Sequence, residues 1–182
     1  SQSITLYDKR MVVDIWYVVP CEEGKEQQLA DSLKCSLNMK EDEEIFVFTY
    51  EHMKRYEGEW HHLITPLFPG YLFVQTEDDK ELKHLTEICT GIQTISGDVC
   101  VFPLEKEAEE FLRELGGSKH YIPMSKGYIR GGITFVTEGP LCGKEKTIRK
   151  IDRHKRLARL DSPLERYQKK GFWTGLEIVS KS

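Results

Sequence analysis

The acidic and basic residues of this 182-residue chain are segregated along its length, and this split limits most strongly what the chain can fold into. Residues 1–120 contain 12 Lys and Arg against 24 Asp and Glu, a net charge of −12, whereas residues 121–182 contain 14 against 6, a net charge of +8. The length allows two small domains. The charge split therefore predicts two modules with different partners, of which the basic one suits a polyanion. Docking of the acidic module on the basic one is the alternative explanation.

The apolar pattern of the acidic part predicts a mixed sheet with helices packed on it. Short runs of β-branched and aromatic residues predict strands, at 12–20, 43–50, 70–77, 91–96 and 97–103. Apolar residues at helical spacing predict helices, at 25–38, 78–89 and 104–115. The polar segment 51–65, with Gly58 at its centre, predicts an exposed hairpin or loop. In the first strand we expect Trp16 and Tyr17 in the core.

The basic part has a different pattern. Residues 116–132 are rich in glycine and predict a linker. The residues that follow contain short strands separated by turns and no helical period, which predicts a small β-barrel. The fold class expected for the whole chain is therefore α+β.

Basic residues are concentrated between positions 144 and 159, where eight Lys and Arg are opposed only by Glu145 and Asp152. Unpaired buried charge is too costly for most of these side chains to lie inside the barrel. Strand alternation predicts that Arg159 projects outward while Ala158 and Leu160 pack inward. Arg and Lys attract phosphates, and Arg can also read base edges. A solvated face or a protein-binding face is the alternative.

Two aromatic residues follow the basic run. Phe172 or Trp173 could stack a base, although for Trp173 we favour a place in the barrel core.

Several function classes are disfavoured by the sequence. The five cysteines have no CxxC spacing, which argues against a zinc site or disulfide framework and favours buried cysteines in a reducing cytoplasm. His52, His61 and His62 fit no standard metal spacing. We find no phosphate-binding loop and no nucleophile elbow, so we expect no cofactor, no metal and no enzymatic activity. No apolar run is long enough to span a bilayer, and we expect a monomeric cytoplasmic protein.

Two motifs in a fixed order resemble a known family. Phe68-Pro69-Gly70-Tyr71 leads into an apolar strand, behind an opening Trp-Tyr-Val-Val at 16–19, and resembles the NGN domain of the NusG transcription factors. Pro69 and Gly70 are expected to form the turn that enters the strand. Gly-Ile-Thr-Phe-Val-Thr-Glu-Gly-Pro-Leu at 132–141 resembles the opening of a KOW motif.

The resemblance implies an α+β fold with an N-terminal NGN mixed α/β sandwich, a sheet with flanking helices, and a C-terminal small KOW β-barrel. The expected boundaries are 12–117 for the NGN domain, 118–130 for the linker and 131–182 for the KOW domain. Residues 1–11 are interpreted as an N-terminal extension or a remnant of expression, without a role.

The resemblance also implies partners. The NGN domain of this family binds the clamp helices of RNA polymerase through a hydrophobic patch, to which Phe68, Tyr71 and Ile88 would correspond. The KOW domain contacts RNA or other factors. Lys146 stands where the KOW pattern expects Gly, and with the basic run this resembles LoaP-type antitermination paralogs, which implies structured nascent RNA as the ligand.

The candidate RNA-binding residues are the basic side chains of the barrel and its rim: Lys144, Lys146, Arg149, Lys150, Arg153, His154, Lys155, Arg156, Arg159, Arg166, Lys169 and Lys170. Two alternatives stay open. One is a general NusG whose KOW domain binds a termination factor or a ribosomal protein. The other is a ribosome-associated RNA-binding protein without polymerase contact.

Overall fold

The computed structural model describes residues 15–37, 39–41, 43–76, 101–164 and 170–182. The chain divides into two compact units, a first unit of Ser1–Val47 and Pro69–Lys106 and a second unit of Phe48–Phe68 and Glu107–Ser182. The helix expected at 78–89 and the strand expected at 91–96 lie outside the described residues.

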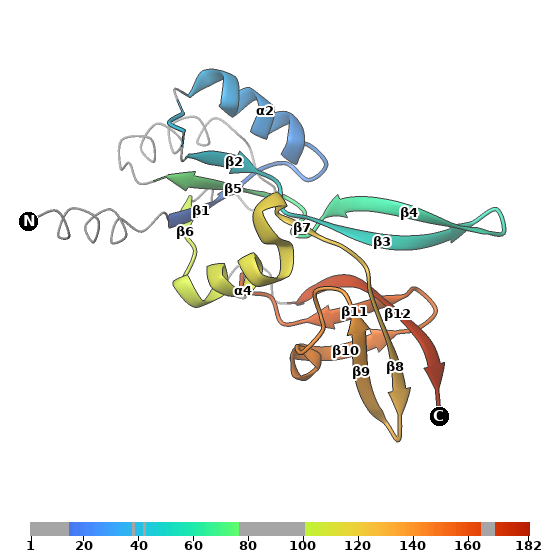
Figure 1. The fold of residues 1–182 in the computed structure, drawn as a ribbon. Helices are drawn as coiled ribbons and strands as arrows, with labels where there is room; N and C mark the ends of the chain where they lie inside the picture. Colours follow the sequence, from blue (N-terminus) through green and yellow to red (C-terminus); the bar gives the residue numbers. More distant parts are fainter. Residues whose placement is uncertain (1–14, 38, 42, 77–100, 165–169) are drawn as a thin grey trace, which may run out of the picture. The chain divides into compact units, whose positions relative to one another are not determined.

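The first unit contains a four-stranded sheet in the order β2-β5-β1-β6, with helix α2 over one of its faces (Figure 1). Its elements are β1 (Ile15–Pro20), α2 (Glu26–Ser36), β2 (Glu44–Phe46), β5 (Tyr71–Thr76) and β6 (Phe102–Pro103). Strand β1 is central and antiparallel to both of its neighbours.

Both faces of β1 are buried, which explains its uninterrupted apolar run. On one face Tyr17 packs in a cluster with Leu33 of α2. On the other face the Trp16 ring lies edge-on to the rings of Phe46 and Phe73, at centroid distances of 5.0 and 6.0 Å. Trp16 is 0% and Tyr17 8% exposed, so the core position expected for both is confirmed.

The Pro69–Gly70 turn is bonded to the start of α2. Gly70 has a φ of 85°, a conformation that L side chains rarely adopt. Its N–H donates to Oε1 of Glu26 at 2.9 Å, and its carbonyl accepts from the N–H of Cys21 at 2.8 Å. The turn geometry expected from the sequence is confirmed.

The second unit contains a three-stranded sheet, β4-β3-β7, and a five-stranded sheet, β10-β11-β12-β8-β9. Its longer elements are β3 (Thr49–Tyr56), β4 (Glu59–Pro66), β8 (Ser125–Arg130), β9 (Ile133–Glu138), β10 (Ile148–Asp152), β11 (Leu157–Leu160) and β12 (Phe172–Lys181). Helix α4 (Lys106–Gly116) begins at the end of the first unit, and the short elements are β7 (Tyr121–Ile122), η1 (Gly117–Lys119) and η2 (Glu145–Thr147). Helices and mostly antiparallel sheets together confirm the α+β class.

The polar segment after the second predicted strand is a long hairpin, as expected. Strands β3 and β4 are joined by Glu57 and Gly58, both with positive φ (53° and 78°), the requirement of a type I′ turn (Figure 1). The single strand predicted over 43–50 is wrong, because β2 ends at Phe46 and β3 begins at Thr49. Between them Phe48 is buried and its carbonyl accepts from the N–H of Leu67 at 2.8 Å.

The segment expected as a linker contains a strand of the five-stranded sheet. Strand β8 pairs antiparallel with β9 and parallel with β12. A Cβ added at Gly127 would lie 2.2 Å from the carbonyl oxygen of Phe135. Glycine there permits close backbone approach, so its presence reflects packing within the sheet. The domain boundaries themselves stay a prediction.

Among the described cysteines Cys21 is buried, whereas Cys35 and Cys142 are exposed, so the expectation of buried cysteines holds for one of these three. Within the same part of the chain, no helix combines the length and apolarity that a membrane span requires.

Candidate nucleic-acid interface

A row of basic and aromatic side chains crosses three neighbouring strands of the five-stranded sheet. Lys150 of β10 lies directly opposite Arg159 of β11, which lies directly opposite Trp173 of β12. Directly paired residues of antiparallel strands share a face. On the opposite face Ala158 and Leu160 are 0% and 1% exposed, so the predicted alternation is confirmed. We call Lys150, Arg159 and Trp173 the cross-strand row.

The turn between β10 and β11 adds further exposed cations at one end of this row. Arg153, His154 and Lys155 are exposed, and within the described residues neither Arg153 nor Lys155 forms an ion pair. The Lys155 backbone N–H donates to Oδ1 of Asp152 at 3.0 Å, which shapes the turn. A cavity of about 470 Å³ lies beside it, lined by Lys150, Ile151, Asp152, Arg153, His154 and Ile178.

Three of the predicted RNA-binding residues, Lys144, Arg149 and Arg156, are engaged by other side chains of the protein. Lys144 pairs with Glu114 of α4. Arg149 donates from Nε to Asp161 at 2.9 Å, and both of these side chains are exposed. Lys146 is exposed in η2. Arg166 and Lys169 lie outside the described residues. The basic run is therefore divided between internal contacts and free surface.

Arg156 has the most extensive of these internal contacts. Its guanidinium lies 4.0 Å from the centroid of the Trp60 ring, and it pairs with Glu177 of β12 at 3.7 Å. Its side chain is 26% exposed. The stack on the β3–β4 hairpin and the ion pair therefore hold much of the Arg156 side chain within the protein.

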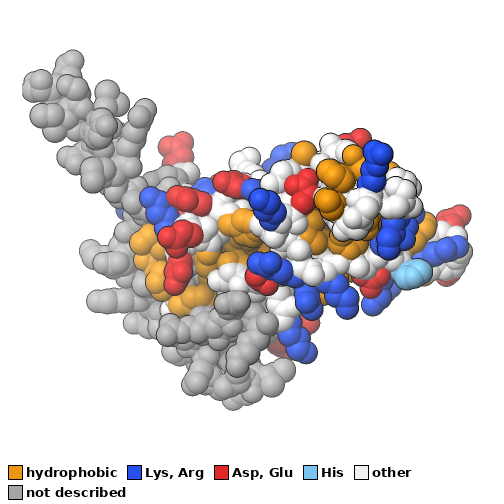
Figure 2. Space-filling model, turned by 90° about the horizontal axis from the view of Figure 1, so that it is seen from below, with side chains coloured by type: hydrophobic (Ala, Val, Ile, Leu, Met, Phe, Trp, Pro, Cys, Tyr) orange, Lys and Arg blue, Asp and Glu red, His pale blue; other side chains and the backbone are white. Residues whose placement is uncertain are grey.

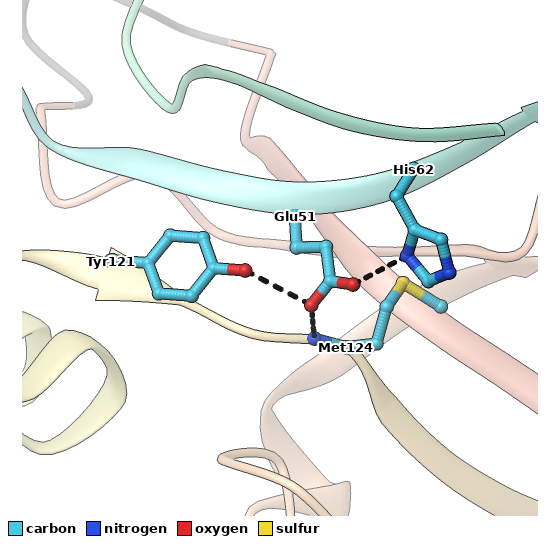
Figure 3. Close-up of polar contacts among 4 residues, drawn as sticks. All are labelled: Glu51, His62, Tyr121 and Met124. Atoms are coloured by element: carbon cyan, nitrogen blue, oxygen red, sulfur yellow. Dashed lines mark hydrogen bonds and ion pairs between the residues drawn. The ribbon is translucent and has the colours of Figure 1, made fainter.

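A carboxylate on the same hairpin holds the chain that enters β8 (Figure 3). Oε2 of Glu51 accepts from the hydroxyl of Tyr121 at 3.0 Å and from the backbone N–H of Met124 at 3.1 Å. Oε1 of Glu51 lies 2.6 Å from Nδ1 of His62. Burial acts to raise the pKa of Glu51, but the bonds from Met124, His62 and Tyr121, with the charge of His62, outweigh it and lower the pKa.

Trp173 is half-buried on the outer face of the sheet, which corrects its expected place in the core. The neighbouring Phe172 occupies that place, being 2% exposed with its ring edge-on to Phe68 at 5.6 Å. The guanidinium of Arg159 lies 6.0 Å from the Trp173 ring centroid. The two residues line a hollow of about 310 Å³, whose lining among the described residues is Arg159, Asp161, Lys170, Gly171 and Trp173.

The three residues expected to contact polymerase differ in their surroundings. Phe68 is 1% exposed and covered on one side by Phe172, whereas Tyr71 is half-buried at the start of β5. Ile88 lies outside the described residues. Of the two rings beside the Pro69–Gly70 turn, only that of Tyr71 has an accessible part.

Exposed apolar side chains on β9 and β12 form a feature that the sequence analysis missed. Ile133, Phe135 and Val179 are 61%, 40% and 63% exposed, and the Phe135 ring stacks on that of Tyr128 at 5.1 Å. The alternation of β9, with Ile133 and Phe135 two positions apart, was the available signal.

Figure 2 shows Lys and Arg side chains beside hydrophobic and acidic ones on one face of the molecule. Within the described part of the chain, no three His, Cys, Asp or Glu side chains group around a possible metal position.

The chain is similar to proteins of one family. A family model described as "Transcription termination factor nusG" matches residues 14–114. The transcription termination/antitermination protein NusG of Pasteurella multocida (strain Pm70) is 29% identical over 147 residues, which cover 77% of this chain and 80% of that protein. The protein of the same name from Vibrio parahaemolyticus serotype O3:K6 is also 29% identical over 147 residues, covering 77% and 81%.

A solved structure is similar in fold. The structure described as "Domain interaction in Thermotoga maritima NusG" aligns with a TM-score of 0.51 and 16% sequence identity, over 91% of this chain and 94% of that one. At this identity the likeness concerns the fold alone, and it agrees with the expected NGN sandwich and KOW barrel.

Proposed function

The chain belongs to the NusG family of transcription factors, and from that premise we propose that it is an elongation and antitermination factor acting on RNA polymerase and nascent RNA. In this proposal the NGN domain binds the clamp helices of the polymerase, and the KOW domain binds a structured element in the transcript. The protein works in the cytoplasm as a monomer, without cofactor or catalysis.

The observation that carries the RNA part of the proposal is the cross-strand row with its neighbouring turn. Lys150, Arg153 and Lys155 offer charge that the described residues do not neutralise by ion pairs, and Trp173 adds an aromatic surface. Such a surface suits phosphates and bases together. The net charge of +8 over residues 121–182 supports the same ligand class.

Two tethered contacts explain how the factor would act. Binding to the transcript raises the local concentration of the NGN domain near the polymerase that is making it, so two modest affinities give tight loading. Selective loading on transcripts that carry the element is the behaviour of a specialised LoaP-type paralog, and we propose that this chain is such a paralog.

A mobility-shift assay with a structured leader RNA, beside a scrambled RNA of equal length, tests the RNA contact. The proposal predicts a shift with the structured RNA at lower protein concentration than with the scrambled one. Co-purification with polymerase tests the other contact. A chain that shifts RNA but never retains polymerase would instead be a ribosome-associated RNA-binding protein.

A second function is favoured by the exposed apolar side chains Ile133, Phe135 and Val179. Exposed apolar groups on a small barrel suit a protein partner, as for a general NusG whose KOW domain binds a termination factor or a ribosomal protein. Polymerase binding without any RNA shift would support this function against the first.

A further inference from the structure

Two arginine–tryptophan pairs lie in the second unit, and they differ in how closely they are packed. The guanidinium of Arg156 lies 4.0 Å from the Trp60 ring centroid and is also paired with Glu177. The guanidinium of Arg159 lies 6.0 Å from the Trp173 ring centroid, and the described residues provide it with no ion pair. The first pair is a closed stack, whereas the second is open.

The open pair is nearly wide enough for a planar group. Optimal carbon contacts on both faces of a flat ring require roughly 7 Å between the groups on either side, at about 3.5 Å a contact. The guanidinium carbon of Arg159 lies 6.0 Å from the Trp173 ring centroid, about 1 Å less than this requirement. A small rotation of the long Arg159 side chain, which is half-buried at the surface, supplies that difference.

The hollow at this pair has the size and charge for one nucleotide. Its volume of about 310 Å³ lies at the lower end of small-molecule sites, which begin near 300 Å³. Among the described lining residues the one carboxylate is that of Asp161, and it is paired with Arg149 at 2.9 Å. The two cations of the lining, Arg159 and Lys170, are therefore not neutralised by Asp161. Aromatic surface with excess positive charge suits a base with its phosphate.

We propose that this hollow binds one unpaired nucleotide of the RNA. The base stacks on Trp173, the Arg159 guanidinium covers its other face, and Lys170 meets its phosphate. A base inside a continuous duplex already has both faces covered by its neighbours, so it cannot enter. The RNA recognised therefore carries a bulged or looped base beside its paired stem. This inference rests on the proposed RNA-binding function.

The test uses the full chain and a hairpin RNA with a single unpaired 2-aminopurine, whose fluorescence falls when it stacks on an aromatic ring. A fully paired hairpin of equal length and charge is the reference RNA. We expect the unaltered protein to quench the unpaired 2-aminopurine and to bind that hairpin more tightly than the paired one. Bound protein that leaves the fluorescence unchanged would overturn the proposal.

Variants locate the stack. Trp173→Ala should lower affinity for the bulged hairpin by roughly 5- to 150-fold, equivalent to about 1 to 3 kcal/mol, and lower affinity for the paired hairpin much less. Trp173→Phe should restore most of the loss. Trp60→Ala removes the other arginine-stacked indole and is the matched control, expected to leave quenching intact. Equal losses on both hairpins with Trp173→Ala, or loss of quenching only with Trp60→Ala, would contradict the site.

Failure of this inference is distinguishable from failure of the proposed function. If the protein binds both hairpins equally without quenching, RNA binding stands and the nucleotide site is wrong. If it binds neither, both are wrong. A DNA hairpin of the same sequence separates two sources of an unpaired nucleotide. If the 2-aminopurine is quenched in both hairpins, the hollow accepts an unpaired nucleotide of RNA or of DNA. If it is quenched in the RNA hairpin alone, the hollow is specific for RNA.

Discussion

His120 is a buried titratable group that should make stability depend on pH. It is 7% exposed, and burial, with a smaller effect from the charge of Arg113, lowers its pKa to about 4 from the ordinary 6.5. Below pH 6.5 His120 binds a proton in the unfolded chain but stays neutral in the folded chain until the pH approaches 4. The contribution of neutral His120 to the free energy of unfolding is therefore fully present above pH 6.5. It is lost as the pH decreases toward 4, by at most about 3 kcal/mol.

His120→Asn tests this dependence, because Asn does not titrate and tolerates the left-handed φ of 52° at this position. We expect the free energy of unfolding, measured in urea at about pH 7 and about pH 5, to change less in the variant than in the parent. An equal change in both proteins would show that another group is responsible.

Two lysines of the basic run should differ in their effect on RNA. Lys144 is paired with Glu114, whereas Lys155 is exposed and makes no ion pair within the described residues. Lys155→Ala should weaken binding to all RNAs alike and reduce the salt slope by about one unit, while Lys144→Ala changes the slope much less. Equal slopes of log K against log salt for the two variants would contradict the expected difference between Lys144 and Lys155.

At the level of single residues, the sequence predicts the face of a strand from which a side chain projects more readily than it predicts the residue with which that side chain pairs. Alternation correctly placed Arg159 outward, and applied to the next strand it would also have turned Trp173 outward once Phe172 was assigned to the core. The ion pair of Lys144 with Glu114 joins residues 30 positions apart in different elements. No local pattern encodes such a contact, so the internal engagement of part of the basic run could not be predicted.

Among the elements, the β3–β4 hairpin is bonded to the chain that enters β8 through the Glu51 carboxylate. Glu51→Gln keeps the shape of the side chain but removes its charge, which weakens the bonds from Tyr121 and Met124. We expect a loss of about 1 to 2 kcal/mol in the free energy of unfolding near neutral pH. Glu59→Gln, at an exposed position on β4, is the control and should cost little.

The same pair of variants has a pH signature. The pKa of Glu51 is lowered in the folded chain, so its contribution is present above the ordinary value of 4.5 and is lost as the pH falls through the folded value. Parent and Glu51→Gln should therefore converge in stability in acid. A difference that persists undiminished at low pH would mean that packing, not charge, explains the loss.

Helices and hairpins were predicted better than the path of the chain between sheets. The period of Leu33 and Leu37 and the turn at Gly58 are local signals, and both elements formed as expected. The run 45–48 is continuously apolar, and nothing in it marks the change of sheet at Val47 and Phe48. Glycine between 116 and 132 suggested a linker, because the need for close backbone approach at Gly127 arises only once β9 is beside it.

On the scale of the whole molecule, the proposal divides polymerase and RNA binding between separate surfaces. Tyr71→Ala should weaken polymerase co-purification and leave RNA affinity unchanged, because its half-buried ring lies beside the Pro69–Gly70 turn. Phe68 is a poor probe, since truncating this buried ring costs about 3 to 5 kcal/mol of stability. Polymerase retained in full by a folded Tyr71→Ala protein would place the contact elsewhere.

The central claim is that the basic barrel binds RNA through its phosphates, and the salt dependence of affinity tests it most directly. The full chain is titrated against a structured leader RNA at several salt concentrations. If roughly four to six basic residues neutralise phosphates, log K should fall with log salt at a slope of about −3 to −5. An affinity that barely changes with salt would contradict the account and assign the basic face to a protein partner.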